Sequence, residues 1–403
     1  PDGELTTLVE FTGTAGANPG SGPFARVVQG SDGNFYGTTI QGGASGFGTV
    51  FRMTPGGGLT TLVEFTGTAG ANPGSYPRAG LVQGSDGNFY GTTSGGGASS
   101  LGTVFGVTPG GELTTLVEFT GTSGASPGSS PYAGLVQGSD GNFYGTTWVG
   151  GASGYGTAFK MTPDGQLTTL VDFTGTAGAN PGRNPKAGLM QGSAGNFYGT
   201  TSGGGASNLG TVFRMTPGGQ LTTLVGFTGT AGANPGSKPE ACVVEGSDGN
   251  LYGTTSEGGA SNLGTVFRMT TPGKPGINLF PPEGLTTTSV DLLCEIIPRG
   301  AATTVSLDYG SDGIEFPNSL VIPPSMTGYQ EIRVGRTLSG FNPGSTYYYR
   351  FRATNNFGET VGPIQSFAIL SEPTVTITAA GELTPTSARL QGQVNARNHD
   401  ATV

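Results

Sequence analysis

A segment reading LTTLV occurs five times in this chain of 403 residues, and successive copies begin 54 residues apart. The copies start at Leu5, Leu59, Leu113, Leu167 and Leu221. Clusters of Gly and Pro divide each repeat into four short runs typical of strands, which in the first repeat are residues 5–11, 25–30, 34–39 and 49–54. Four antiparallel strands in a repeat of this length are typical of a propeller blade. The repeats therefore predict an all-β fold with a five-bladed β-propeller over residues 1–273.

Two turns in each repeat support this division into strands. Residues 31–34 read SDGN, which places Asp-Gly between two strand-like runs. This is a strong hairpin signal, because Gly accepts the positive φ that such a turn requires. Residues 54–57 read TPGG, where Pro presets the φ of one turn residue and Gly follows it. We predict a β-hairpin at each of these turns.

The order of the strands indicates how a ring of blades would close. By analogy with other propellers, we expect residues 25–30 to form an innermost strand and the LTTLV run to form an outermost one. The fifth repeat stops after its third strand, and residues 274–278 read KPGIN where another LTTLV would begin. We therefore expect residues 5–11 to pair with this third strand, which would remove an exposed sheet edge from the fifth blade.

Composition and charge narrow the class of protein. The chain contains 78 Gly and 27 Pro residues, which suits short strands joined by tight turns. A net charge of −9 and scattered Lys and Arg residues argue against nucleic-acid binding. No run of 18 apolar residues occurs, so we expect no membrane span, and we expect the chain beginning at Pro1 to be a mature or excised fragment. Cys242 and Cys294 are expected to be buried free thiols, with a disulfide as the alternative.

Beyond about residue 277 the repeat stops and a different all-β pattern begins. Residues 338–353 read LSGFNPGSTYYYRFRA, which resembles the corner and strand signature of fibronectin type III modules. Side chains alternate between the two faces of a strand. The side chains expected in the core are Tyr347, Tyr349 and Phe351, and those expected in water are Arg350 and Arg352.

This signature sets the predicted domain boundaries. An immunoglobulin-like, fibronectin type III sandwich is expected over residues 274–370. Residues 386–394 repeat the pattern of residues 288–292, so the start of a second sandwich module is expected over residues 371–403. Residues 373–403, 31 in all, supply too few strands for a core of their own.

The NFYGTT, GTVF and LTTL elements, which recur in the same order, resemble those of the Gloeobacter/Verrucomicrobia (GloVer) tandem-repeat family. The resemblance covers residues 1 to about 273. It implies an exported bacterial protein with a surface-exposed propeller, in a family that carries varied C-terminal anchoring signals. It implies no particular biochemical activity.

The repeats also bear on catalysis. An enzyme needs one unique constellation of reactive groups, whereas near-identical blades supply a near-copy of each acidic position in every repeat. The one histidine, His399, lies outside the repeats, and no motif for a nucleophile, a zinc protease or a nucleotide site occurs. We expect a non-catalytic protein that needs no cofactor, with a glycoside-active enzyme as the less favoured alternative.

Two polar positions recur along the repeats. The SDGN turn supplies Asp32, Asp86, Asp140 and Asp248. Calcium binding is one interpretation, but Ala194 in the fourth repeat favours a turn-forming role and no metal site. The innermost strands supply Gln29, Gln83, Gln137, Gln191 and Glu245. These side chains could ring the channel, and satisfied polar groups at its edge are the favoured alternative.

The most informative positions vary between repeats while their neighbours stay constant. The candidate ligand-binding residues at these positions are Phe24, Phe47, Arg78, Tyr132, Trp148, Tyr155, Lys186 and Glu240. In a propeller the connections that carry them share one face, so we expect the side chains to gather there. Aromatic and charged groups on Gly-rich loops suit glycan or protein binding, with Trp148 and Tyr132 as stacking candidates. Neutral drift at exposed loop positions is the alternative.

Together these patterns favour a secreted or cell-surface protein with a structural or adhesive role. Its expected partners are glycans or other surface proteins, and its C-terminal modules could self-associate by strand addition. A multivalent lectin with up to five equivalent weak sites is the alternative.

Overall fold

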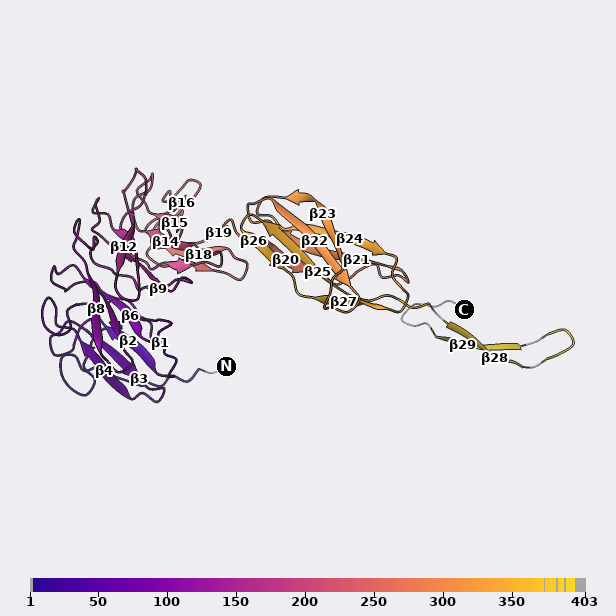
Figure 1. Ribbon diagram of the computed structural model, residues 1–403, viewed down its shortest axis with the longest axis horizontal. Coiled ribbons are helices and arrows are strands. Elements are labelled where there is room, and N and C mark those ends of the chain that lie inside the picture. Colours follow the sequence, from indigo (N-terminus) through magenta and orange to yellow (C-terminus); the bar gives the residue numbers. More distant parts are fainter. Residues whose placement is uncertain (1–2, 373, 382, 388, 396–403) are drawn as a thin grey trace. The chain divides into compact units, whose positions relative to one another are not determined.

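The computed structural model describes residues 3–372, 374–381, 383–387 and 389–395 of the chain (Figure 1). Every regular element that it contains is a β-strand. The chain divides after Met269 into two compact units, a repeat unit and a C-terminal unit. The all-β prediction is therefore confirmed for the described residues.

The repeat unit consists of five consecutive antiparallel sheets, one for each repeat, whose strands follow in chain order (Figure 1). The first sheet is β1 (Val28–Gln29), β2 (Phe35–Thr39), β3 (Thr49–Met53) and β4 (Leu59–Glu64). The second is β5 (Val82–Gln83), β6 (Phe89–Thr93), β7 (Thr103–Val107) and β8 (Leu113–Glu118). The third is β9 (Val136–Gln137), β10 (Phe143–Thr147), β11 (Thr157–Met161) and β12 (Leu167–Asp172). The fourth is β13 (Met190–Gln191), β14 (Phe197–Thr201), β15 (Thr211–Met215) and β16 (Leu221–Gly226), and the fifth is β17 (Val244–Glu245), β18 (Leu251–Thr255) and β19 (Thr265–Met269).

Both predicted hairpin turns form where the sequence places them. At the turn between β1 and β2, Gly33 has a φ of 81° and donates its N–H to the Gly30 carbonyl at 2.9 Å. At the turn between β3 and β4, Gly57 has a φ of 90° and its N–H donates to the Thr54 carbonyl at 2.9 Å. A positive φ is costly for residues other than Gly, so these glycines fix where each strand ends. The innermost strand is shorter than expected, two residues rather than the predicted run of residues 25–30.

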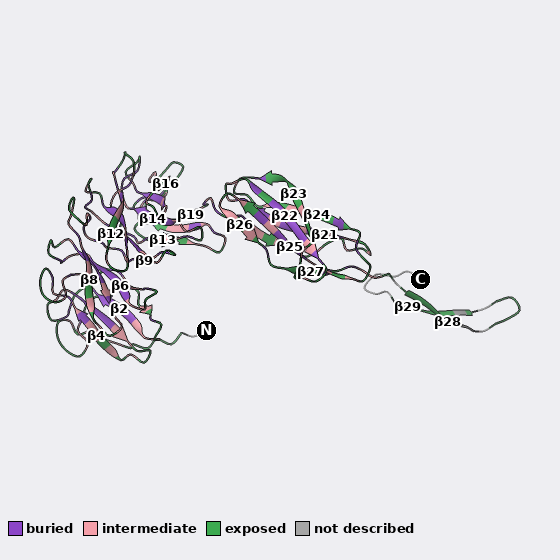
Figure 2. Ribbon diagram, in the orientation of Figure 1, coloured by how far each residue is buried: buried purple, intermediate pink, exposed green. Residues whose placement is uncertain are grey.

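Many residues in the strands of the repeat unit are buried (Figure 2). The hydrophobic cores they form lie between consecutive sheets rather than within one sheet. In the first core, Tyr36 of β2 stacks on Phe89 of β6 with ring centroids 3.8 Å apart. Phe65, which follows β4, meets Phe105 of β7 edge to face at 5.2 Å. Phe51 and its counterparts pack between repeats through such contacts, and each sheet depends on its neighbours for burial.

The prediction that residues 5–11 complete the fifth sheet is wrong in this structure. The fifth sheet has three strands, and residues 3–10 form no strand. Leu5 is 94% exposed, and Val266 of β19 is 83% exposed where a fourth strand would lie. The later part of the segment packs on the first repeat, because Leu8 lies against Gly57 and Phe11 contacts Phe51 at 5.3 Å. The outer edge of β19 therefore has no pairing strand among the described residues.

We expect a chain that starts at Leu8 to be as stable as the longer chain, within about 0.5 kcal/mol, because the segment removed forms no sheet pairing. Urea unfolding of both chains would measure the difference, and removal through Phe11 is the contrasting variant because it uncovers Phe51. A loss of several kcal/mol, or oligomers formed by the chain that starts at Leu8, would show that residues 5–7 pair with β19 in solution.

The C-terminal unit contains a two-sheet sandwich (Figure 1). One sheet is β20 (Gly276–Leu279), β21 (Ser289–Ile297) and β24 (Ile332–Ser339). The other has β22 (Thr303–Gly310), β23 (Asn318–Met326), β25 (Thr346–Asn355), β26 (Gly358–Val361) and β27 (Gln365–Ala368). The alternation predicted for β25 is confirmed for Tyr349 and Phe351, which are buried in the core, while Tyr347 is half-buried against it.

The two arginines of β25 depart from the expectation that they face water. Arg350 and Arg352 are each about one-third exposed and both form ion pairs with Asp308 of β22, at 3.2 and 2.8 Å. Asp308 is buried with 3% exposure. This paired charge cluster holds β22 against β25 and is a feature that the sequence did not reveal.

Residues beyond the sandwich form one described hairpin, β28 (Thr374–Gly381) and β29 (Arg389–Asn395). Two of its apolar side chains are exposed, 65% for Val375 and 71% for Ile377. His399 lies outside the described residues.

Candidate functional site

The innermost segments of all five repeats line one cavity of about 900 Å³. Its walls include Val28, Val82, Val136, Met190 and Val244, which occupy equivalent positions in the five repeats. A Cβ atom at Gly80 would lie 2.9 Å from the Arg26 carbonyl oxygen, so the glycine lets neighbouring segments approach closely. Since residues from the first and the fifth repeat share this cavity, the array curves around a common centre.

Two side chains break the similarity of the repeats inside this cavity. Arg26 and Cys242 occupy the position that is Gly80, Gly134 and Gly188 in the other repeats. Cys242 is a free cysteine, as expected, but the prediction that it is buried is wrong, because its surface reaches the cavity. The cavity walls desolvate the thiol and raise its pKa, and the nearby Arg26 charge opposes this effect. Cys294 is free and buried, as predicted.

The recurring Gln residues are satisfied polar groups that join neighbouring repeats. The Gln83 side-chain oxygen accepts the Ser31 N–H of the preceding repeat at 3.0 Å, and its amide nitrogen donates to the Gly87 carbonyl at 3.1 Å. Gln137 and Gln191 form the equivalent bonds, and Glu245 accepts from Ser193. The favoured interpretation of this series is confirmed.

The recurring Asp residues brace their own hairpins. Asp86 accepts hydrogen bonds from the Asn88 side chain at 2.7 Å and from the Tyr90 hydroxyl at 2.7 Å. Desolvation would raise the pKa of Asp86, but these two bonds outweigh it and hold the pKa below its usual value. Burial, together with the Asp86 charge, raises the pKa of Tyr90 to about 12. The turn-forming interpretation of the Asp series is therefore confirmed by its bonding.

Several of the variable positions meet across the boundary between repeats. The Arg78 guanidinium lies over the Tyr132 ring at 5.1 Å, and Tyr132 packs against Trp148 with ring centroids 5.0 Å apart. Tyr132 and Trp148 are half-buried and Arg78 is exposed. We call these three residues the aromatic cluster. It offers flat apolar faces together with a positive charge, the elements that stack on a sugar ring or a protein side chain.

The other variable positions have different surroundings. Lys186 forms an ion pair with Glu240 of the next repeat at 3.0 Å, and Phe24 is 80% exposed. Phe47 and Tyr155 lie against Gly67 and Gly175 of the following repeats, where a Cβ atom would be 2.9 and 3.1 Å from their rings. These two aromatic residues pack between repeats and do not join the aromatic cluster.

A family model for the Gloeobacter/Verrucomicrobia repeat matches residues 1–184 and 126–280, well over half of the chain. The chain belongs to this repeat family. No curated protein matches the chain. No helix among the residues that the structure describes is long and apolar enough to cross a membrane.

Solved structures resemble this Gloeobacter/Verrucomicrobia repeat protein only weakly. The sensor domain of the anti-sigma factor RsgI4 from Pseudobacteroides cellulosolvens is 20% identical, with 24% of this chain and 95% of that domain covered and a TM-score of 0.20. An ulvan lyase of polysaccharide lyase family PL25 is 11% identical, with 92% and 89% covered and a TM-score of 0.32. The third fibronectin type III domain of human KIAA0343 protein is 19% identical, with 30% and 88% covered and a TM-score of 0.14. TM-scores this low support no argument about function.

Sequence reasoning named the members of the aromatic cluster but not their contacts. Arg78 and Tyr132 occupy the same position of consecutive Gloeobacter/Verrucomicrobia repeats, 54 residues apart, as do Lys186 and Glu240. The sequence feature that could have indicated these contacts is that consecutive repeats carry complementary residues at this position. Arginine is followed by tyrosine, and lysine is followed by glutamate.

Proposed function

We propose that this chain is a non-catalytic extracellular protein with a structural or adhesive role, whose repeat unit presents the aromatic cluster to a glycan or a surface protein. Membership of the Gloeobacter/Verrucomicrobia repeat family and the all-β structure fit an exported, β-rich protein. The rigid, glycine-rich scaffold suits display of side chains more than conformational change.

We further propose that the five sheets are the blades of a five-bladed β-propeller. The support is that β1, β5, β9, β13 and β17 all contribute to one central cavity. Consecutive sheets also repeat the same Tyr-to-Phe contact, as in the pairs Tyr36–Phe89, Tyr90–Phe143 and Tyr144–Phe197.

The observation that carries the proposed function is the aromatic cluster itself. Trp148 stands where other repeats have Ser94, Ser202 and Ser256, whose hydroxyls donate to a backbone carbonyl of their own repeat. The fold therefore accepts a small side chain there, and Trp148 is not needed to maintain it. A half-buried tryptophan beside a tyrosine and an arginine suits ligand stacking.

The multivalent lectin with five equivalent sites receives less support. The equivalent positions form an aromatic cluster in one place, an ion pair in another and a lone exposed Phe24 in a third. Five weak equal sites would need five similar environments. The aromatic cluster therefore supports one binding site rather than five.

We expect Trp148→Ser to weaken binding to the glycan or surface protein that the chain recognises at least 10-fold. The melting temperature should not change, since serine already occupies this position in three repeats. A glycan array and adhesion to purified surface proteins would measure the change. The control is Ser256→Ala, at the same position of the fifth repeat. Binding that survives Trp148→Ser unchanged would contradict the proposed site.

Self-association through the C-terminal hairpin is a further part of the proposal. The hairpin β28–β29 leaves Val375 and Ile377 exposed, and a second copy could pair with its free edges by strand addition. We expect the chain to form larger species that disappear when residues 371–403 are removed. Sedimentation as a monomer at high concentration would contradict this part.

A further inference from the structure

One side chain that fills the boundary between repeats is absent from the second repeat. The residue directly after GTVF or GTAF is basic in four repeats, where it is Arg52, Lys160, Arg214 and Arg268. In the second repeat it is Gly106. This is the one basic position of the strand. Gly106 has a hydrogen atom in place of a long cationic side chain, and the strand keeps the same pairing as its counterpart in the first repeat.

In the other repeats the basic side chain has a defined setting. Arg52 reaches the turn of the following repeat, where its Nη1 donates to the Pro109 carbonyl at 3.4 Å. Burial and the Asp32 carboxylate raise the pKa of Tyr36, and the Arg52 charge acts against them. Lys160 likewise favours the ionised form of Asp140. The cation thus sits between the Asp–Tyr pair of its own hairpin and the turn of the next repeat.

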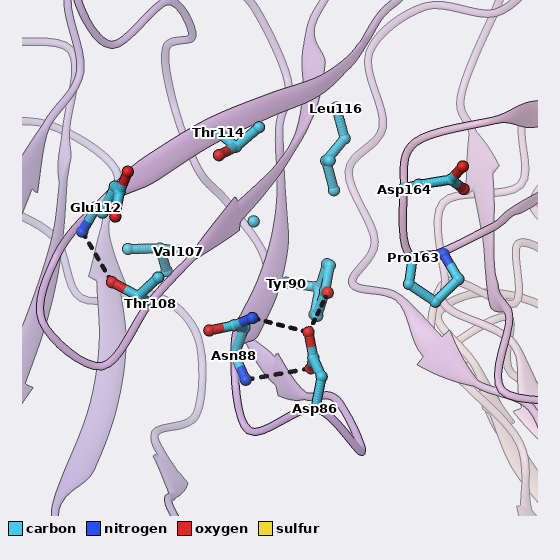
Figure 3. Close-up of a pocket in the computed structure, with 11 residues that line it drawn as sticks. Asp86, Asn88, Tyr90, Val107, Thr108, Glu112, Thr114, Leu116, Pro163 and Asp164 are labelled. Carbon is cyan, nitrogen blue, oxygen red and sulfur yellow. Dashed lines mark hydrogen bonds between the residues drawn. The ribbon is translucent and has the colours of Figure 1, made fainter.

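At Gly106 the same setting is an open pocket of about 500 Å³ (Figure 3). Tyr90 and Asp86 form one side, and Pro163, the equivalent of Pro109, lies opposite them on the turn of the third repeat. Leu116 supplies an apolar wall. Three acidic residues line the pocket, Asp86, Glu112 and Asp164, and the Asp164 carboxylate accepts a hydrogen bond from the Thr162 hydroxyl.

The glycine is not required by the backbone. The φ of Gly106 lies outside the left-handed region, and a Cβ atom there would make ordinary contacts, 3.5 Å to Leu116 Cδ1 and 3.5 Å to Tyr90 Cε1. A side chain would fit, as it does in the other repeats. The open space therefore comes from the choice of residue rather than from a strained turn.

The charges around the pocket have changed together with the missing cation. Glu112 stands where the third and fourth repeats have Gln166 and Gln220. Asp164 stands where other repeats have Gly56, Gly110 and Gly218. The pocket of the second repeat thus has no internal cation, and two acidic residues stand where sister repeats have Gln or Gly.

We propose that this pocket binds the guanidinium group of an arginine side chain from a partner protein. The internal template is Arg52, whose setting the second repeat reproduces without its own cation. A guanidinium group fits better than an ammonium group, because its planar fork can bond a carboxylate and a backbone carbonyl together. No group of His, Cys, Asp and Glu among the described residues is arranged to hold a metal ion. The proposal is independent of the aromatic cluster, since the two share no residue.

The direct test titrates the full chain with the peptide acetyl-Gly-Arg-Gly-amide, followed by calorimetry or by NMR. We expect saturable binding with a dissociation constant on the order of 1 mM, as suits a single side chain. The uncharged analogue acetyl-Gly-citrulline-Gly-amide should bind at least 10-fold more weakly. Equal binding of the two peptides, or no binding of either, would overturn the proposal.

Substitutions that install residues of the other repeats distinguish an effect on peptide binding from an effect on folding. Gly106→Arg should restore the internal cation and abolish peptide binding, while the melting temperature stays the same or rises. If this variant fails to fold, the double variant Asp164→Gly, Glu112→Gln is used, since both new residues occur at these positions in sister repeats. It should weaken binding at least 10-fold. Unchanged binding by these variants would overturn the site. Tighter binding of putrescine than of the arginine peptide would overturn the assignment to an arginine side chain.

Discussion

Replacing Phe159 with alanine should lower the free energy of unfolding of the repeat unit by about 3 to 5 kcal/mol, the usual cost of emptying a buried phenylalanine site. Phe159 is fully buried and contacts Phe119 edge to face at 5.6 Å. Its ring lies over Gly145, where a Cβ atom would be 2.6 Å from Cζ. Because Gly145 has no side chain to move into the space, we expect little relaxation and a cost near the upper end.

The matched control is Phe267→Ala, the same residue in the last repeat. Phe267 is half-buried, since the fifth sheet has no fourth strand among the described residues, so its replacement should cost roughly half as much. The single Trp148 lies in the repeat unit, and its fluorescence in a urea titration reports the unfolding of this unit alone. Equal losses at Phe159 and Phe267, or a loss below about 1 kcal/mol at Phe159, would show that the core does not lie between consecutive sheets.

Replacing Asp308 with asparagine should destabilise the sandwich by about 2 to 4 kcal/mol, because it leaves two arginines without their buried partner. Arg350 and Arg352 are 32% and 33% exposed, so water can solvate part of their charge and the loss should stay below that of a fully buried pair. The variant Arg336→Gln, on a strand of the same sandwich but away from Asp308, is the control.

The pH dependence of the sandwich gives a second readout of Asp308. Desolvation opposes ionisation of this carboxyl, but hydrogen bonds from Ser319, Arg350 and Arg352 outweigh it and hold the pKa below the usual 3.8. A lowered native pKa means that the stabilisation is complete above the unfolded pKa and disappears as the pH falls below it. The parent chain should therefore lose stability below about pH 4 more steeply than Asp308→Asn.

Labelling of Cys294 measures this effect in the sandwich alone. Burial raises the pKa of the Cys294 thiol to about 12, so it reacts only when the sandwich opens. The second thiol is removed by Cys242→Gly, which installs the residue of three sister repeats. Parallel pH profiles for the parent and Asp308→Asn would contradict the assigned role of Asp308.

Much of the fold follows from local sequence chemistry. The positions of the two hairpins in each repeat depend on Asp-Gly and Pro-Gly pairs only a few residues long, and both form as predicted. The alternation of Tyr349 and Phe351 with Arg350 likewise depends on the strand period.

The residues of the aromatic cluster were predictable as candidates, but their contacts were not. Variation among near-identical repeats singled out Arg78, Tyr132 and Trp148 together with Phe47 and Tyr155. The structure brings the first three together and buries part of Phe47 and Tyr155 against the next repeat. Loop variation alone does not say whether a side chain faces solvent or the neighbouring sheet.

The sequence by itself determined the repeat length, the strands, the turns and the side of each strand that is apolar, because these depend on contacts within a few residues. The tertiary structure decided which surfaces meet over longer separations. It left residues 5–10 without a strand partner and β19 without a fourth strand among the described residues, joined Arg78 to Tyr132, and opened the pocket at Gly106. These outcomes depend on how one sheet is rotated against the next, and that rotation results from packing many side chains at once.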